Sequence, residues 1–320
     1  MKRSTKFAAL IVSLVAGNVL AQGFPAKPIH LVVGSPPGGI DAYVRLFGPR
    51  TSETLGQPVV IENKGGANGA IGADYVARSA PDGYTLLFAT SGALVHGVIL
   101  TRNRPFDPLK DFTPIANMVS TLKVMTVHAS LPFTSVKEVI DFAKKNPGKL
   151  TYASNGNTTV FHITGELFKV AAGVDILHVP YKGTGAMATE LMSGRVDLGF
   201  AALNNVKSYI AAGKLKVVAV AEPQRYAGLP NVPTVAETVP NFLPPPSWNA
   251  IFGPASMPRP VVERLNAAFV KSLDASEVKN FMEQNGAVGV GGTPDQMAAT
   301  LKADFATATR LLKETAIQPE

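Results

Sequence analysis

Short apolar strands alternate with amphipathic helices along most of this chain, and this alternation limits its fold more than any other feature. The first apolar, β-branched run spans residues 29–33, a turn follows at 34–39, and a helix is expected from Asp41 to about Leu55. Further strands are expected at 58–62, 84–89, 123–128, 151–154, 175–179, 196–200, 215–221 and 248–252, and further helices near 74–77 and at 135–146, 159–172, 185–193, 260–273 and 295–315. Such an alternation predicts α/β layers with a largely parallel sheet.

The order of these segments predicts two lobes and a hinge. A chain of 320 residues is long enough for two domains. It is expected to leave the first set of strands near Thr121 and to rejoin it near Trp248. We therefore expect lobe 1 at residues 22–121 together with 250–320, and lobe 2 at residues 122–249. Two crossing segments would form the hinge, and ligands of open α/β sheets bind at the carboxyl ends of strands, here in a cleft between the lobes.

Residues 1–21 have the features of a secretory signal peptide. Residues 1–6 are basic, and the apolar run at 7–20 is shorter than the roughly 20 residues that a membrane span needs. Small residues at Val19 and Ala21 predict cleavage after Ala21. No later run reaches about 18 apolar residues, so we expect a soluble, exported mature chain.

Composition excludes several classes of protein. The chain has no cysteine, which excludes a disulfide framework, a cysteine-ligated metal site, a cysteine nucleophile and a lipid-anchoring cysteine. The formal net charge is +7, and loss of Lys2, Arg3 and Lys6 with the signal peptide would lower it by three, to +4. The remaining basic residues are dispersed, so we expect no nucleic-acid partner.

Three small, polar turns lead from an expected strand into an expected helix. They span residues 35–41, 154–159 and 181–185. The first turn of a helix carries unpaired backbone N–H groups and a partial positive charge, and glycine lets a ligand approach the backbone closely. Threonine hydroxyls in the second and third turns can donate to a carboxylate. Helix capping explains each turn taken alone, and an anion site between the lobes is an equally good explanation of all three together.

Other chemistries have less support. The five histidines are scattered, with no pair four residues apart, so we expect no metal site. Residues 183–188 fit the G-x-G-x-x-A pattern of dinucleotide sites, but Asp197 comes too early to be the acid expected about 20 residues later, so we expect no cofactor. Ser154 and His162 could serve a secreted hydrolase or esterase, yet an orienting acid and a G-x-S-x-G motif are missing. This hydrolase is the alternative from another functional class, and His162 could instead line the cleft and favour a negative ligand.

Motifs that typify one protein family occur in order along the mature chain. They are IHLVVGSPPGGIDAYVR at 29–45, the segment from VVIEN to PDGY at 59–84, DPLKDF at 107–112, PGKLTYASNG through His162 at 147–162, HVPYKG at 178–183, LPNVPTVAE at 229–237 and Trp248. With these motifs the chain resembles the periplasmic substrate-binding proteins of tripartite tricarboxylate transporters, often called Bug receptors. The likeness covers essentially the whole mature chain and does not depend on a single motif.

The resemblance implies a type II-like periplasmic binding protein, or Venus flytrap, with two α/β lobes joined by two crossing segments. It also implies a non-enzymatic receptor that captures a small carboxylate between the lobes and delivers it to a membrane permease in the bacterial envelope. The expected ligand-binding residues are Ser35, Pro37, Gly38, Gly39, Asp41, Thr90 and Ser91 in lobe 1, and Ser154, Thr158, Thr159, His162, Lys182 and Ala201 in lobe 2. We expect a monomer that works in the periplasm.

The chain departs from the family pattern at three places near this site. Gly34 and Ser35 replace the usual proline and aromatic residue, Ala201 stands where an aspartate is common, and Asn204 stands where a proline is often found. An acid at position 201 could have met a ligand amine or hydroxyl. Its absence favours plain organic acids over amino acids as ligands.

Overall fold

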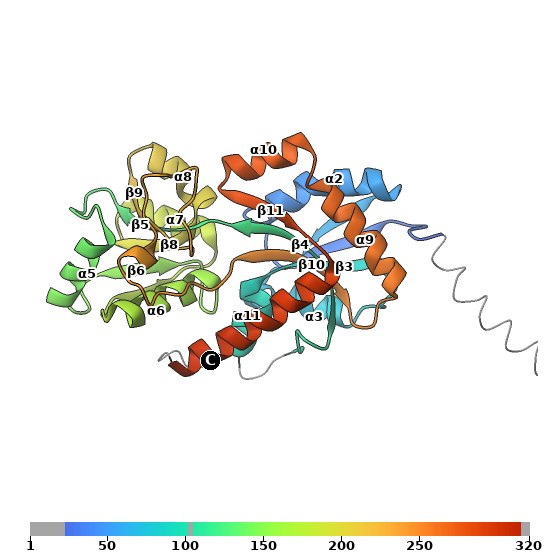
Figure 1. Ribbon diagram of the computed structural model, residues 1–320, viewed down its shortest axis with the longest axis horizontal. Helices are drawn as coiled ribbons and strands as arrows, with labels where there is room; N and C mark the ends of the chain where they lie inside the picture. The colour runs from blue at the N-terminus through green and yellow to red at the C-terminus, as the bar shows by residue number, and fades with distance from the viewer. Residues whose placement is uncertain (1–22, 102–104, 315–320) are drawn as a thin grey trace, which may run out of the picture.

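The structure is a computed structural model that describes residues 23–101 and 105–314, with side chains as far as Arg310. Its strands form two sheets, and helices cover both faces of each sheet (Figure 1). The signal peptide expected at residues 1–21 lies outside the described residues. Within 23–101 and 105–314, no helix is long and apolar enough to cross a membrane.

The six-stranded sheet has the strand order β11-β4-β10-β3-β1-β2. Its strands are β1 (Ile29–Val33), β2 (Val59–Asn63), β3 (Thr85–Thr90), β4 (Phe112–Thr121), β10 (Trp248–Pro254) and β11 (Ala287–Gly291). One face packs against α2 (Asp41–Leu55), α9 (Arg259–Ser272) and α10 (Ser276–Gln284), and the other against α3 (Ala70–Ala77), η2 (Gly92–His96), α4 (Gly97–Ile99) and α11 (Pro294–Glu314). In β1, Leu31 and Val33 face the first core and Val32 the second. Apart from the exposed His30, β1 is apolar, because both of its faces are buried from Leu31 to Val33.

The five-stranded sheet has the order β7-β6-β8-β5-β9. Its strands are β5 (Lys123–His128), β6 (Thr151–Ser154), β7 (Leu177–Pro180), β8 (Leu198–Ala202) and β9 (Leu215–Val220). The helices α5 (Val136–Lys145) and α6 (Val160–Ala172) and the turn η3 (Val235–Glu237) pack on one face, and α7 (Thr184–Ser193) and α8 (Leu203–Ala211) on the other. Each sheet therefore has an apolar core on both sides.

Both sheets are mixed, so the expectation of a largely parallel sheet is wrong. β1 runs parallel to β2 and β3, and β6 runs parallel to β7 and β8. The pairs β3–β10, β10–β4, β4–β11, β5–β8 and β5–β9 are antiparallel. Neither β4 nor β11 is among the strands expected from the sequence. The chain leaves the six-stranded sheet along β4 and returns along β10, which lies next to β4. These two strands therefore run in opposite directions.

Local capping explains why the expected helices form close to their expected places. Ser135 and Glu138 form a reciprocal capping box at the start of α5. Gly56, Gly173 and Gly194 follow the last residues of α2, α6 and α7 in the left-handed conformation that glycine adopts without strain.

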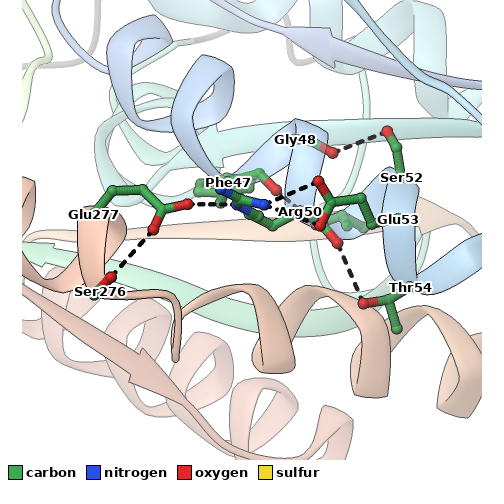
Figure 2. Close-up of polar contacts among 9 residues, drawn as sticks. Phe47, Gly48, Arg50, Ser52, Glu53, Thr54, Ser276 and Glu277 are labelled. Carbon is green, nitrogen blue, oxygen red and sulfur yellow. Dashed lines mark hydrogen bonds and ion pairs between the residues drawn. The ribbon is translucent and has the colours of Figure 1, made fainter.

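Polar contacts hold α2 against α10 at the surface of the six-stranded sheet (Figure 2). Arg50 on α2 donates to Glu277 on α10 and, at 2.9 Å, to Glu53 on its own helix. The hydroxyls of Ser52 and Thr54 donate to backbone carbonyls of α2, those of Gly48 and Arg50. Exposed ion pairs of this kind contribute little to stability, so the apolar core beneath α2 remains the main support of this face.

The chain crosses between the sheets twice. β4 passes directly into β5 through Leu122, and residues 221–247 lead from β9 back to β10. The crossings touch, because the Thr121 N–H donates to the Ser247 carbonyl at 3.2 Å and the two hydroxyls lie 2.7 Å apart. Below, lobe 1 means the unit built on the six-stranded sheet and lobe 2 the unit built on the five-stranded sheet. The residue boundaries given for the lobes above remain a prediction.

Candidate functional site

The first polar turn joins β1 to α2 and presents backbone to solvent. Pro37, Gly38 and Gly39 are exposed. The φ angles of Gly38 and Gly39, 100° and 58°, suit glycine and strain other residues. The Ser35 Oγ is buried and has no hydrogen-bond partner in the protein. The turn therefore offers an unused hydroxyl next to accessible backbone.

Asp41, at the start of α2, is occupied by its own neighbours. Its carboxylate accepts from Arg45 Nε at 2.7 Å and from Asn63 Nδ2 at 2.9 Å. Burial opposes ionisation of Asp41, but the hydrogen bonds from Arg45 and Asn63 outweigh it and lower the pKa. Asp41 thus anchors the turn to α2 and β2.

The second polar turn follows β6, where Ser154 and three rings form a compact group. Ser154 Oγ lies 2.7 Å from His178 Nε2, and the Ser154 residue is fully buried. The His178 ring stacks between Tyr152 and His162, with centroid distances of 4.7 and 4.3 Å. Burial, and then the neighbouring His162 and Lys169, lower the pKa of His178 to about 3. His178 is therefore a neutral ring that orients Ser154.

Thr158 and Thr159 shape the start of α6. Thr159 Oγ1 accepts from the His162 N–H at 3.4 Å and so caps the helix. Thr158 has a φ of 61°, and its N–H donates to His162 Nδ1 at 3.2 Å. His162 therefore supports the unusual backbone of Thr158.

Thr90 and Ser91 lie at the end of β3, where η2 begins. Thr90 Oγ1 accepts from the Ala93 N–H at 3.0 Å. Ser91 is buried, and its hydroxyl donates to the Pro246 carbonyl at 2.9 Å. Ser91 thus links η2 to the second crossing segment.

The third polar turn lies directly beside the second. The Tyr181 N–H donates to the Ser154 carbonyl at 3.0 Å, and the Gly183 N–H donates to the Asn155 carbonyl at 3.2 Å. Lys182 is exposed in this turn. The parallel pairing of β6 and β7 brings these two turns to one edge of the sheet.

Ala201 lies near the carboxyl end of β8, the parallel neighbour of β6. It is fully buried and belongs to the apolar core that includes Val124, its partner on β5. A residue in this position contributes packing to lobe 2.

A row of close contacts brings the first turn, η2 and the second turn together. A β-carbon on Gly34 would lie 3.1 Å from Gly69 Cα, and one on Gly69 would lie 3.1 Å from the Ala93 β-carbon. The Asn68 amide nitrogen then reaches the Thr158 carbonyl across the lobes at 3.3 Å. The glycine-rich turn of lobe 1 that contains Asn68 therefore meets the second polar turn, in lobe 2.

Asn68, which makes this contact between the lobes, is not among the binding residues expected from the sequence. It lies in η1 (Ala67–Gly69), within a glycine-rich turn after β2. The available signal is its type, because asparagine tolerates the left-handed conformation and carries a carboxamide that can bond to backbone.

A buried polar cluster, also missed, lies where the lobes join. Lys123, fully buried at the start of β5, donates to Glu222 through its backbone N–H at 3.0 Å and through Nζ at 2.7 Å. Trp248, at the start of β10, donates its indole N–H to Asp304 on α11 at 2.9 Å. Burial lowers the pKa of Lys123, against the effect of Glu222, and raises the pKa of Asp304 to about 7. Burial, and then the charge of Lys123, lower the pKa of His96 to about 4.

The hydrolase alternative gains no support from this geometry. The histidine bonded to Ser154 at 2.7 Å is His178. The Ser154 hydroxyl also lies 3.1 Å from the Gly156 carbonyl, so it is occupied within the protein, and a histidine with a pKa of about 3 is a weak base at neutral pH. Among residues 23–101 and 105–314, no three metal-ligating side chains gather at one point.

Known sequences match this chain over nearly its whole length. The family model described as "Tripartite tricarboxylate transporter family receptor" matches residues 44–317. A protein in the tcbD-tcbE intergenic region of Pseudomonas sp. strain P51 is 34% identical over 318 residues, which cover 98% of this chain and 94% of the relative. Protein BugT of Bordetella pertussis is 33% identical over 304 residues, with 94% and 93% covered.

Solved structures also resemble this chain, in both sequence and fold. A structure described as a periplasmic transporter is 38% identical, with a TM-score of 0.86, and the match covers 93% of this chain and all of that one. R. palustris Rpa4515, solved with adipate, is 34% identical with the same TM-score and coverage. MatC from Rhodopseudomonas palustris, solved with malate, is 30% identical with a TM-score of 0.82, and the match covers 90% and 99% of the two chains.

These matches confirm the resemblance and the periplasmic-binding-protein fold expected from the sequence. The chain belongs to the tripartite tricarboxylate transporter receptor family.

Proposed function

We propose that this receptor captures a small organic anion, a carboxylate, between its lobes and delivers it to a tripartite tricarboxylate-type permease. The observation that carries the proposal is the contact between the lobes of Asn68, in the glycine-rich turn after β2, with Thr158 in the second polar turn. Membership of a receptor family supports the same function.

The chemistry of the turns supports a carboxylate as the ligand. The Ser35 hydroxyl has no partner in the protein and can donate to an anion. Gly38 and Gly39 leave the neighbouring backbone accessible. Lys182 adds positive charge near the second turn. The adipate and malate of the two solved relatives are both dicarboxylates, so we take dicarboxylates as the first ligands to test.

Isothermal titration with adipate, malate and glutamate tests this proposal. We expect saturable binding of at least one of the first two acids and weaker binding of glutamate. Ser35→Ala should weaken binding about 13- to 160-fold, the usual range for one hydrogen bond to a charged group, and leave the melting temperature unchanged. Ser193→Ala, at the end of α7, is the control and should bind normally.

Two results would contradict the proposal. If none of the carboxylates binds in the titration, carboxylates are not the ligands of this receptor. Release of product from a chromogenic ester, abolished by Ser154→Ala, would favour the hydrolase instead.

We also propose that the chain works in the periplasm as a monomer after removal of residues 1–21. Sequencing the amino terminus of protein recovered from the periplasm should give Gln22 as the first residue. Light scattering should give the mass of one chain. An intact Met1, or a stable dimer, would overturn the corresponding part of the proposal.

A further inference from the structure

One side chain of lobe 1 reaches lobe 2 beside the polar turns. Asn68 Nδ2 lies 3.2 Å from the Gly92 carbonyl, 3.3 Å from the Thr158 carbonyl and 3.3 Å from Thr158 Oγ1. Gly92 begins η2 in lobe 1, and Thr158 precedes α6 in lobe 2. The carboxamide is therefore shared between an acceptor in its own lobe and two acceptors in the other.

Residues with a strained backbone lie at this contact. Four non-glycine residues in the described part of the chain have a positive φ, and three of them are Ala67, Asn68 and Thr158, at 46°, 52° and 61°. Such conformations are costly for residues other than glycine and persist where the surrounding structure enforces them, often at functional sites. Thr158 and Ala67, the neighbour of Asn68, are thus held in conformations that their own preferences disfavour, whereas asparagine tolerates this one.

Two glycines make room for the contact. A β-carbon on Gly97 would lie 3.3 Å from Asn68 Nδ2 and 3.0 Å from the Gly92 carbonyl oxygen. A β-carbon on Gly92 would lie 3.4 Å from the Val160 backbone nitrogen. A side chain at Gly97 would push the carboxamide away from η2, because these contacts are tighter than ordinary packing, and a side chain at Gly92 would lie in van der Waals contact with the start of α6.

We propose that Asn68 is an interlobe latch, a positioning residue whose carboxamide holds the turn before α6 against η2 and so favours the joined arrangement of the lobes. When the lobes separate, the bonds to Thr158 break, while the bond to Gly92 keeps the amide in place for rejoining. The latch acts with or without ligand. Its effect on ligand affinity rests on the function proposed above, because a ligand held between the lobes gains from any contact that favours their joining.

Two substitutions distinguish the effect of the Asn68 carboxamide from the effect of backbone strain. Asn68→Gly removes the carboxamide and relieves the left-handed backbone. Asn68→Asp keeps the shape and tolerates the same backbone, but it places a carboxylate against the carbonyl oxygens of Thr158 and Gly92, to which it cannot donate. The matched control is Asn266→Asp, because Asn266 Nδ2 donates to two carbonyls, of Ile115 and Gly292, that both lie in lobe 1.

The chain has no cysteine, so spin labels can be placed at two chosen positions only. Glu53→Cys on α2 and Lys137→Cys on α5 put one label on each lobe at exposed sites. Without ligand, we expect Asn68→Gly to lower the ratio of joined to separated lobes about 2- to 13-fold, the effect of one neutral hydrogen bond, and Asn68→Asp to lower it further. Asn266→Asp should leave the distance distribution unchanged.

Distances that are the same in the parent chain and in both Asn68 variants would overturn the latch. An equal change in Asn266→Asp would also overturn it, because general destabilisation would then explain the result. Titration of the same variants with adipate and malate gives a separate readout. Failure of the parent chain to bind any carboxylate would refute the proposed function and leave the ligand-free result on the latch intact.

Discussion

Replacing Asp304 should change how the stability of the protein depends on pH. Asp304 is 4% exposed on α11 and accepts the indole N–H of Trp248, where the second crossing segment enters β10. Burial raises the pKa of this carboxyl from 3.8 to about 7, although the hydrogen bond from Trp248 and the charge of Lys123 act in the opposite direction. The fold therefore prefers the protonated carboxyl.

The size of the effect follows from the difference between the two pKa values. The unfolded chain releases this proton near pH 4 and the folded chain near pH 7, so the stability linked to the proton is fully present below pH 4 and is lost as the pH rises to 7. Three pH units at about 1.4 kcal/mol each amount to about 4 kcal/mol. Asp304→Asn retains an oxygen for Trp248 and cannot ionise, so it removes this loss.

Urea unfolding followed by circular dichroism between pH 4 and pH 8 measures the difference. We expect parent and Asp304→Asn to be similar in unfolding free energy at pH 4, and the variant to be the more stable by up to about 4 kcal/mol at pH 8. Trp248 is the only tryptophan, so its emission should titrate near pH 7 in the parent and not in the variant. The control is Asp295→Asn, because the hydrogen bond and charge of Arg259 lower the pKa of exposed Asp295, and its loss should destabilise at neutral pH. A stability difference for Asp304→Asn that does not grow with pH would refute the reasoning.

Two further predictions concern packing and the buried ion pair. Lys123→Met should lower the unfolding free energy by about 3 kcal/mol, because it leaves Glu222 unpaired. Adding Glu222→Gln should restore part of this loss. If urea unfolding shows that the effects of the two substitutions on the unfolding free energy simply add, the pairing is contradicted. Gly165→Ala should cost about 1–3 kcal/mol, because its β-carbon would lie 2.3 Å from the Tyr152 ring. Gly185→Ala on α7, with nothing within 4 Å, is the control, and equal melting temperatures for these two variants would count against the packing argument.

Element type could be predicted where the local pattern is strong. The strand at 123–128 has the predicted bounds, and the helix expected at 135–146 is α5, because an amphipathic repeat, a capping box and a following Pro-Gly all agree. The glycine–valine strand β11 was missed, because its two exposed valines and its glycines carry no apolar alternation. Strand direction was predicted wrongly because pairing in β4, β10 and β11 joins segments far apart in the chain.

The polar turns were recognisable because each combines glycine or small hydroxyl residues with a strand-to-helix boundary. What each side chain does there was not recognisable. Asp41 is bonded to Arg45 and Asn63, and Ser91 to Pro246, so their polar groups are already occupied within the protein. Such assignments depend on partners supplied by other elements, which spacing along the chain does not reveal.

The sequence by itself determined the α/β class, the helix boundaries set by local capping, the polar turns and the family, because these depend on patterns that neighbouring residues create. Only the tertiary structure decided the antiparallel pairs of each sheet, the contact of Asn68 with Thr158 and the burial of Lys123 and Asp304 at the crossing. Long-range packing sets those features, since burial and close approach alter a side chain's partners and its pKa only after distant segments meet.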